Sequence, residues 1–176
     1  RTRQSADHSM AYIVATLLRK ALQMKAGNGG VPTGGGAHDE AWKALMLDPY
    51  DYQVSASAIH HPVTRALMER IEFTHGGEEY DSKYPDGIPT SIVIEASDGS
   101  KHDSGLVMYP AGHARNTTAD LRDILAHKFR LLGALSVPEG REAQPLIDRL
   151  EALPALDAPG VARLLDFEIG ERPGYE

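Results

Sequence analysis

Residues 5–18 read Ser5-Ala6-Asp7-His8-Ser9-Met10-Ala11-Tyr12-Ile13-Val14-Ala15-Thr16-Leu17-Leu18, and this stretch decides the predicted fold. It has the pattern of a helix that Asp7 caps and that ends near residues 25–26. Its apolar residues recur at spacings of three and four, so they share one face that we expect to be buried. These residues are Met10, Ile13, Val14, Leu17, Leu18, Ala21 and Leu22.

The other face of this helix carries polar side chains. His8 and Tyr12 are expected one turn apart on it, with Ser9 and Thr16 beside them. An imidazole and a phenol in this arrangement could transfer protons. An ordinary solvated helix face has the same pattern, and spacing alone does not separate the two interpretations.

Length and composition limit the classes of function. A chain of 176 residues suits one domain or a piece of a larger protein, and the start at Arg1, close to the first helix, leads us to expect a preceding segment or a second polypeptide. The net charge of −7 gives no general attraction to nucleic acid or anionic membranes. Cysteine is absent, which excludes disulfides and thiolate chemistry within these residues and is compatible with the cytoplasmic location that we expect. No apolar run is long enough for a membrane span.

The rest of the chain predicts helices around a small antiparallel sheet. One helix is expected at residues 38–47, and another within the segment 56–71, with Pro62 in its first turn. A strand is expected at 71–75, and strands at 90–96 and 101–109 flank the hairpin signal Asp98-Gly99. Three further helices are expected from residue 118 and near 141–153 and 159–167, the first with the apolar stripe Leu121, Ile124, Leu125, Phe129 and Leu132. This order predicts an α+β fold.

Two segments suggest ligand sites only weakly. The glycine-rich stretch 27–36 lacks the preceding strand and the Gly-Lys-Ser/Thr sequence of a phosphate-binding loop, which favours a flexible connector. His60, His61 and His75 do not have the spacing of known metal-binding motifs, so we predict no metal site.

The loop after the hairpin contains His113 and Arg115 beside Gly112. An arginine guanidinium binds a carboxylate through two parallel hydrogen bonds, so this pair could hold a carboxylate substrate. A solvated turn with polar residues gives the same sequence.

Three segments, taken in order, resemble the MmgE/PrpD family. They are Asp7-His8-Ser9-x-x-Tyr12 at the start of an apolar helix, Tyr109-Pro110-x-Gly112-His113-Ala114-Arg115 after the hairpin, and Lys128-Phe129-Arg130 in the following helix. The family includes 2-methylcitrate dehydratase and cis-aconitate decarboxylase, and the second segment is most similar to the dehydratase branch. Asn116-Thr117-Thr118 departs from the more basic run of that branch, which leaves the exact substrate open.

The resemblance implies a domain organisation. Family members combine a large helical domain with a smaller α+β lid, and the active site lies in the cleft between them. By this resemblance residues 1–135 supply a lid-type domain that is incomplete at its amino terminus, and residues 136–176 return to the helical domain. The family's amino-terminal helical domain, which carries further acid–base residues, has no counterpart in this sequence.

The resemblance also implies lyase chemistry that needs no cofactor. Tyr12 and His8 are the implied catalytic residues, while Ser9, His113 and Arg115 are implied to hold a di- or tricarboxylate substrate. No residue matches the family's main catalytic base, so we expect a second polypeptide or the missing helical domain as a partner, in an oligomer. A decarboxylase, an epimerase and a non-catalytic carboxylate-binding or regulatory lid are the alternatives.

Overall fold

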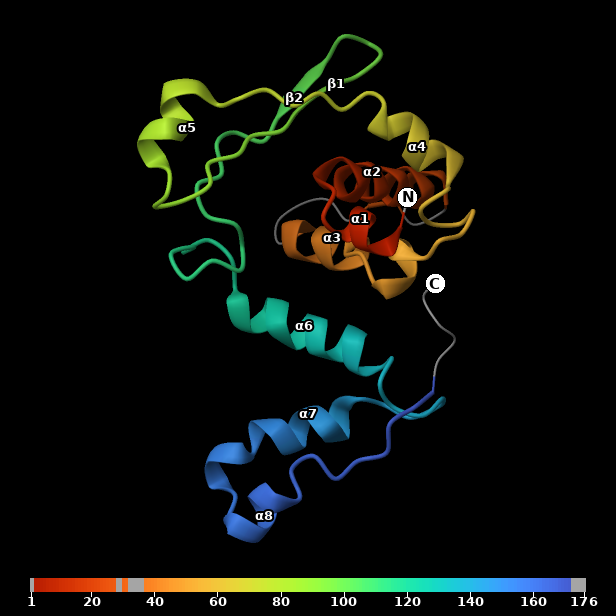
Figure 1. Ribbon diagram of the computed structural model, residues 1–176, viewed down its shortest axis with the longest axis vertical. Helices are drawn as coiled ribbons and strands as arrows, with labels where there is room; N and C mark the ends of the chain where they lie inside the picture. Colours follow the sequence, from red (N-terminus) through yellow and green to blue (C-terminus); the bar gives the residue numbers. More distant parts are fainter. Residues whose placement is uncertain (1, 28–29, 32–36, 172–176) are drawn as a thin grey trace. The chain divides into compact units, whose positions relative to one another are not determined.

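The computed structural model describes residues 2–27, 30–31 and 37–171, and it confirms the α+β class (Figure 1). The predicted connector at 27–36 lies largely outside the described residues. The α-helices are α1 (Arg3–Asp7), α2 (Met10–Ala26), α3 (Ala37–Leu45), α4 (Pro62–Met68), α5 (Gly77–Lys83), α6 (Leu121–Gly133), α7 (Gln144–Glu151) and α8 (Ala158–Ala162). Two 3-10 helices are η1 (Pro49–Tyr52) and η2 (Leu153–Ala155), and the strands are β1 (Val93–Glu95) and β2 (Lys101–Asp103).

The chain divides into two compact units. The first unit contains residues 1–71 and 127–176, and the second contains residues 72–126. The assignment of residues 1–135 to a lid-type domain refers to a complete enzyme of the family. The two units do not test it, so this assignment stays a prediction.

The start of α2 differs from the sequence prediction. Its cap is Ser9, whose Oγ accepts the backbone N–H of Tyr12 at 3.2 Å. Asp7 is therefore not the cap: it ends the short helix α1, and its carboxylate pairs with the neighbouring His8. Because His8 lies between two helices, it does not share a continuous helical face with Tyr12. The end of α2 at Ala26 agrees with the prediction.

The face of α2 that the structure buries is the polar one. Tyr12 and Ala15 are 1% and 0% exposed, and Thr16 and Arg19 are also buried. The prediction that the apolar stripe is buried is wrong, since Met10 and Leu22 at its two ends are 55% and 53% exposed. The other members of the stripe, Ile13, Val14, Leu17, Leu18 and Ala21, are only partly buried.

Close packing of α2 against α4 explains this choice of face. Ala15 and Thr16 on α2 and Thr64 on α4 are each 0% exposed, and such small side chains allow two helices to approach closely. Ala6, Tyr12 and Ile59 form the buried cluster beside this contact, and the partly buried Tyr52 and Met68 pack against it. Pro62 occupies the first turn of α4, as predicted.

The second unit contains the predicted hairpin. β1 and β2 pair antiparallel, with Ile94 opposite His102, and Gly99 in the turn has the positive φ of +84° that this turn favours. A further bridge joins Thr90 to Val107. The strand predicted at 71–75 is wrong: this segment has no strand partner among the described residues, and α5 follows it.

The C-terminal part of the first unit contains α7 and α8, which are shorter than predicted. Val137, Ala143 and Ile147 are its buried apolar side chains. The segment after α8 returns to the loop after α6, where the backbone N–H of Gly170 donates to the carbonyl oxygen of Ser136 at 2.8 Å. A Cβ at position 170 would lie only 2.2 Å from the carbonyl oxygen of Val137, so this close approach requires glycine.

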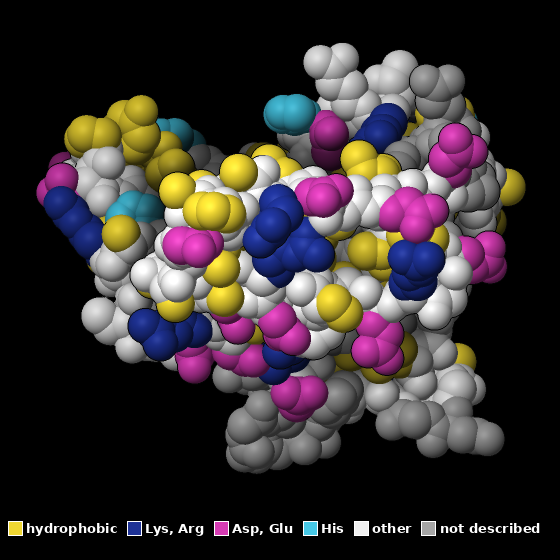
Figure 2. Space-filling model, turned by 90° about the horizontal axis from the view of Figure 1, so that it is seen from below, with side chains coloured by type: hydrophobic (Ala, Val, Ile, Leu, Met, Phe, Trp, Pro, Cys, Tyr) yellow, Lys and Arg dark blue, Asp and Glu magenta, His cyan; other side chains and the backbone are white. Residues whose placement is uncertain are grey.

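The surface mixes charges of both signs. On the face drawn in Figure 2, Lys and Arg side chains are interspersed with Asp and Glu side chains and with hydrophobic ones. Within residues 2–27, 30–31 and 37–171, no helix has the length and apolar character needed to cross a membrane.

Candidate functional site

The loop that follows the hairpin brings His113 and Arg115 together, beside Tyr109. The ring of His113 stacks on that of Tyr109, with centroids 4.9 Å apart and planes inclined by 20°. The Arg115 guanidinium carbon lies 6.0 Å from the centroid of the same tyrosine ring. Asn116 stabilises the turn, because its side-chain amide donates to the carbonyl oxygen of Tyr109 at 2.8 Å.

Arg115 also meets Asp86, a residue that the sequence analysis did not single out. Its Nη1 lies 3.7 Å from Asp86 Oδ1 and donates to the Asp86 carbonyl oxygen at 3.5 Å. The hydroxyl of Tyr109 and the carboxylate of Asp86 both raise the pKa of Arg115. The Arg115 side chain is 57% exposed, so its guanidinium is a fixed positive charge that an incoming anion can reach.

Close packing places Asp86 next to this loop. Gly87 and Pro89 are buried, and a Cβ on Gly87 would lie 2.6 Å from Met108 Cε and 2.8 Å from the Met108 carbonyl oxygen. The predicted hairpin could have indicated that Asp86 lies near the loop with Arg115. If Thr90 pairs with Val107, the residues just before 90 lie beside those just after 107.

The geometry defines the protonation of the His113 ring. Its Nδ1 accepts the backbone N–H of Arg115 at 3.1 Å, so Nδ1 carries no proton in this arrangement. The proton of the neutral ring then belongs to Nε2, which is the atom that can donate to a ligand. The Tyr109–His113–Arg115–Asp86 cluster therefore combines a guanidinium and an imidazole N–H, both suited to a carboxylate.

Tyr12 lies in a different environment, within the first unit. Its hydroxyl donates to the carbonyl oxygen of Asp51, its ring lies 5.9 Å from that of Tyr52, and burial raises the pKa of its phenol. The Asp51 carboxylate contacts Arg19 Nη2 at 3.4 Å and Lys20 Nζ at 2.8 Å. The expectation that Tyr12 lies on an exposed polar face is wrong for the described chain, because a core of aromatic and charged groups encloses it.

His8 and Ser9 do not join Tyr12 in one site. The His8 side chain is 80% exposed, and its Nδ1 contacts the Asp7 carboxylate and the Gln4 carbonyl oxygen. Ser9 caps α2 with its hydroxyl. Tyr12, His8 and Ser9 belong to the first unit, whereas His113 and Arg115 belong to the second.

Replacement of Asp7 by asparagine is expected to lower the pKa of His8. The hydrogen bond to the Asp7 carboxylate, and then the bond to Gln4, raise this pKa above 6.5. The raised pKa stabilises the fold below the unfolded-state value, and this contribution is lost as the pH rises through the folded-state pKa. NMR titration of the His8 ring protons measures the shift, with the unsubstituted chain as the reference. An unchanged His8 midpoint in Asp7→Asn would contradict the pairing.

His61 and His75, which were considered as metal ligands, have structural contacts. His61 Nδ1 accepts the N–H of Val63 and caps α4, and burial together with the charge of Arg19 lowers the pKa of His61. His75 Nδ1 accepts the N–H of Gly77, and its Nε2 lies 3.5 Å from Asp81. In the part of the chain that the structure describes, no three His, Asp or Glu side chains are grouped closely enough to hold a metal ion.

Comparison with known proteins gives one match. The family model of the MmgE/PrpD C-terminal domain matches residues 47–152, which include the hairpin, Asp86, His113, Arg115 and the helices from α4 to α7. No curated protein and no solved structure matches the chain. The match covers more than half of the 176 residues and contains the Tyr109–Arg115 motif. The chain therefore belongs to the MmgE/PrpD family.

Proposed function

We propose that this chain is part of a cofactor-independent lyase that eliminates water from a small di- or tricarboxylate, in the manner of 2-methylcitrate dehydratase. The observation that carries the proposal is the Tyr109–His113–Arg115–Asp86 cluster in a chain of the MmgE/PrpD family. In this reaction a base removes a proton next to a carboxylate, the C–O bond breaks, and the hydroxide leaves as water after receiving a proton. The proposed role of the cluster in this reaction is to bind the substrate carboxylate.

Arg115 is the proposed carboxylate anchor. Its present partner, Asp86, is 78% exposed at the side chain, and solvent screening makes an ion pair this exposed weak. A substrate carboxylate has the same chemistry as Asp86 and can replace it with two parallel hydrogen bonds. Tyr109 keeps the guanidinium in place during this exchange, and His113 Nε2–H is the proposed second donor.

Tyr12, His8 and Ser9 are the other proposed site residues. Donation of a proton from Tyr12 to a substrate requires its hydroxyl to leave the Asp51 carbonyl oxygen in the assembled enzyme. His8 needs no such rearrangement, because its ring is exposed and its carboxylate partner favours the protonated form. His8 is therefore the more accessible proton donor of the two.

A partner is part of the proposal. The stripes on α2 and α6 leave large apolar side chains exposed, among them Met10, Leu22, Leu125 and Phe129. Large apolar side chains that a helix leaves exposed in this way are a feature of protein–protein contact surfaces. We propose that a helical domain, on a second polypeptide or on a longer chain, covers these stripes and supplies the base, in a cytoplasmic oligomer.

The proposal can be tested on the chain purified alone and together with the product of its genomic neighbour. Each preparation is incubated with 2-methylcitrate, and formation of the unsaturated product is measured by its ultraviolet absorbance. Turnover that requires the partner supports the proposal. Release of carbon dioxide from cis-aconitate would instead indicate a decarboxylase. Carboxylate binding without turnover in every complex would indicate a binding or regulatory lid and contradict the proposal.

Replacement of Arg115 by glutamine in the active complex is expected to lower kcat/KM by roughly 10- to 100-fold, mainly through a higher KM. The lost interaction is a charge-assisted hydrogen bond pair, worth about 1.5–3 kcal/mol. Arg122→Gln is the matched control, because Arg122 is an exposed arginine of the same unit outside the cluster. Equal kinetics of Arg115→Gln and Arg122→Gln would remove Arg115 from the proposed site.

A further inference from the structure

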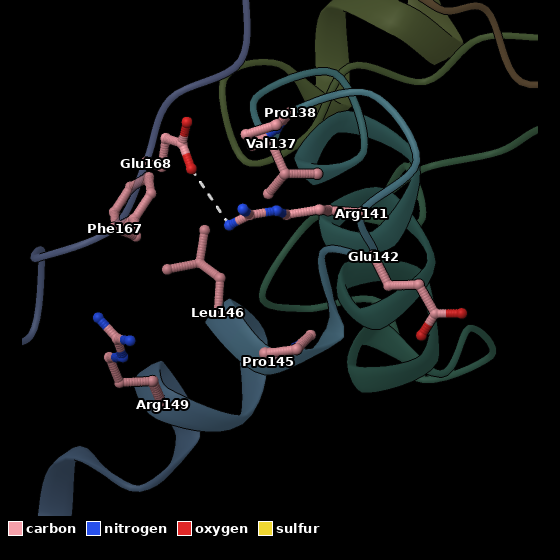
Figure 3. A pocket seen from close by; sticks show the side chains of 9 residues that line it. All are labelled: Val137, Pro138, Arg141, Glu142, Pro145, Leu146, Arg149, Phe167 and Glu168. Carbon is pink, nitrogen blue, oxygen red and sulfur yellow. Dashed lines mark ion pairs between the residues drawn. The ribbon is translucent and has the colours of Figure 1, made fainter.

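A pocket of about 380 Å³ lies in the C-terminal part of the first unit, and no residue of the Tyr109–Arg115 loop belongs to its lining (Figure 3). Val137 from the loop after α6, Leu146 from α7 and Phe167 from the returning segment give it apolar walls. Arg141 and Arg149 also line the pocket, as does Glu168, which lies beside Phe167. The volume is within the range of small-molecule sites in proteins.

Specific contacts hold the walls of this pocket together. Gly170 bonds to Ser136, and the close approach of its backbone to Val137 tolerates no side chain. Arg149 Nη1 donates to the carbonyl oxygens of Arg163 and Asp166, which fixes the returning segment against α7. The pocket is therefore bounded by α7, by a loop and by a segment that are joined to one another.

The two arginines differ in their availability to a ligand. Arg149 is engaged with main-chain carbonyl groups and keeps its full positive charge near the pocket. Among the described residues, the Arg141 guanidinium pairs with Glu168, at 3.2 Å between Nη1 and Oε2. The side chains of this pair are 66% and 64% exposed, and an ion pair so exposed is weak and easily exchanged.

We propose that this pocket binds a small organic monocarboxylate with an apolar body. The ligand carboxylate takes the place of Glu168 on Arg141, and the apolar body lies against Val137, Leu146 and Phe167. Of the two guanidinium groups, only that of Arg141 has a partner that a ligand can readily displace, so the pocket offers a site for one carboxylate. Glu142 and Glu168 at the lining disfavour a second negative charge, so the ligand class differs from the di- or tricarboxylate proposed for Arg115.

The test is a titration of the ¹⁵N-labelled 176-residue chain with 3-phenylpropanoate, followed by amide chemical shifts. We expect shifts at residues of the loop 137–142, α7 and the segment 167–170. The neutral 3-phenylpropanamide is the matched ligand, and we expect it to bind at least about tenfold more weakly because it lacks the charge. The absence of saturable shifts at these residues, or equal affinity of acid and amide, would overturn the proposal.

Three variants locate the ligand on Arg141. Arg141→Gln is expected to weaken binding about tenfold, and Glu168→Gln to tighten it about threefold by removing the competing carboxylate. Arg70→Gln, an exposed arginine of the same unit outside the pocket, is expected to leave the affinity unchanged. Unchanged binding in Arg141→Gln, or weaker binding in Glu168→Gln, would overturn the assignment. This readout needs no turnover, so it does not depend on the lyase proposal.

Discussion

Replacement of Tyr12 by alanine is expected to lower the free energy of unfolding of the first unit by about 3–5 kcal/mol, as for other large buried aromatic residues. Tyr12 is 1% exposed, packs against Ile59 and Tyr52, and donates its hydroxyl to the Asp51 carbonyl oxygen. The substitution removes the ring from the centre of the cluster and leaves that carbonyl oxygen without its donor. Urea unfolding followed by circular dichroism measures the loss.

Leu22→Ala is the matched control for this prediction. Leu22 belongs to the same helix and to the apolar stripe that hydrophobicity alone assigns to the core, yet it is 53% exposed. Its replacement is expected to cost no more than about 1 kcal/mol, since little apolar surface is lost from the core. A larger loss in Leu22→Ala than in Tyr12→Ala would show that the stripe is the buried face after all.

Tyr12→Phe separates the structural role of this residue from a catalytic one. It keeps the ring and removes a single hydrogen bond, so the expected loss of stability is about 1 kcal/mol. If Tyr12 also donates a proton in the assembled enzyme, kcat falls far more than this loss explains, and the pH dependence of kcat changes. Unchanged kcat with the expected loss of stability would assign Tyr12 to the core alone.

The elements that could be predicted from the sequence are those with local causes. Asp98-Gly99 specifies a tight turn, Pro62 specifies the start of a helix, and both are confirmed. The strand predicted at 71–75 failed because a short apolar run needs a partner strand, and no local signal reports whether one exists. Local chemistry therefore located this turn and this helix start, but it could not supply the partner of a strand.

The buried side of α2 could not be predicted for a different reason. Periodicity identifies the helix and its two faces, but the face that packs depends on the shape and charge of a distant segment. Here α4, with the buried Thr64, packs against α2, with the buried Thr16, and Asp51 offers a carboxylate to Arg19. The apolar stripe is then left for another contact, which is the basis of the proposed partner.

In the candidate site, too, contacts between residues that are distant in sequence could not be predicted. His113 and Arg115 are near in sequence, so their proximity could be predicted, and the structure brings them together beside Tyr109. Asp86 was missed because 29 residues separate it from Arg115. Its place becomes visible only after the pairing of Thr90 with Val107 is known, because that pairing aligns the two loops at one end of the hairpin.

Replacement of Asp51 by alanine is expected to destabilise the first unit by about 3–5 kcal/mol, the cost of removing one member of a largely buried ion pair. The carboxylate serves Arg19 and Lys20, which are 8% and 22% exposed at their side chains, and its Oδ2 also accepts the backbone N–H of Asp48. Without it, Arg19 and Lys20 lose their anionic partner and keep the carbonyl oxygens of Ser57 and Met46, while the Asp48 N–H loses its side-chain acceptor.

Glu40→Ala tests whether this cost depends on burial. Glu40 pairs with Lys43 at 3.2 Å within one helix of the same unit, but its side chain is 66% exposed, so the expected loss is about 0–0.5 kcal/mol. The same urea measurement applies to both variants. Equal losses in Asp51→Ala and Glu40→Ala would mean that water reaches the Arg19–Asp51–Lys20 group. The Tyr12 hydroxyl, which bonds to the Asp51 carbonyl oxygen, would then not be enclosed either. In that case the hydroxyl could turn from this carbonyl oxygen to a substrate without a rearrangement of the core.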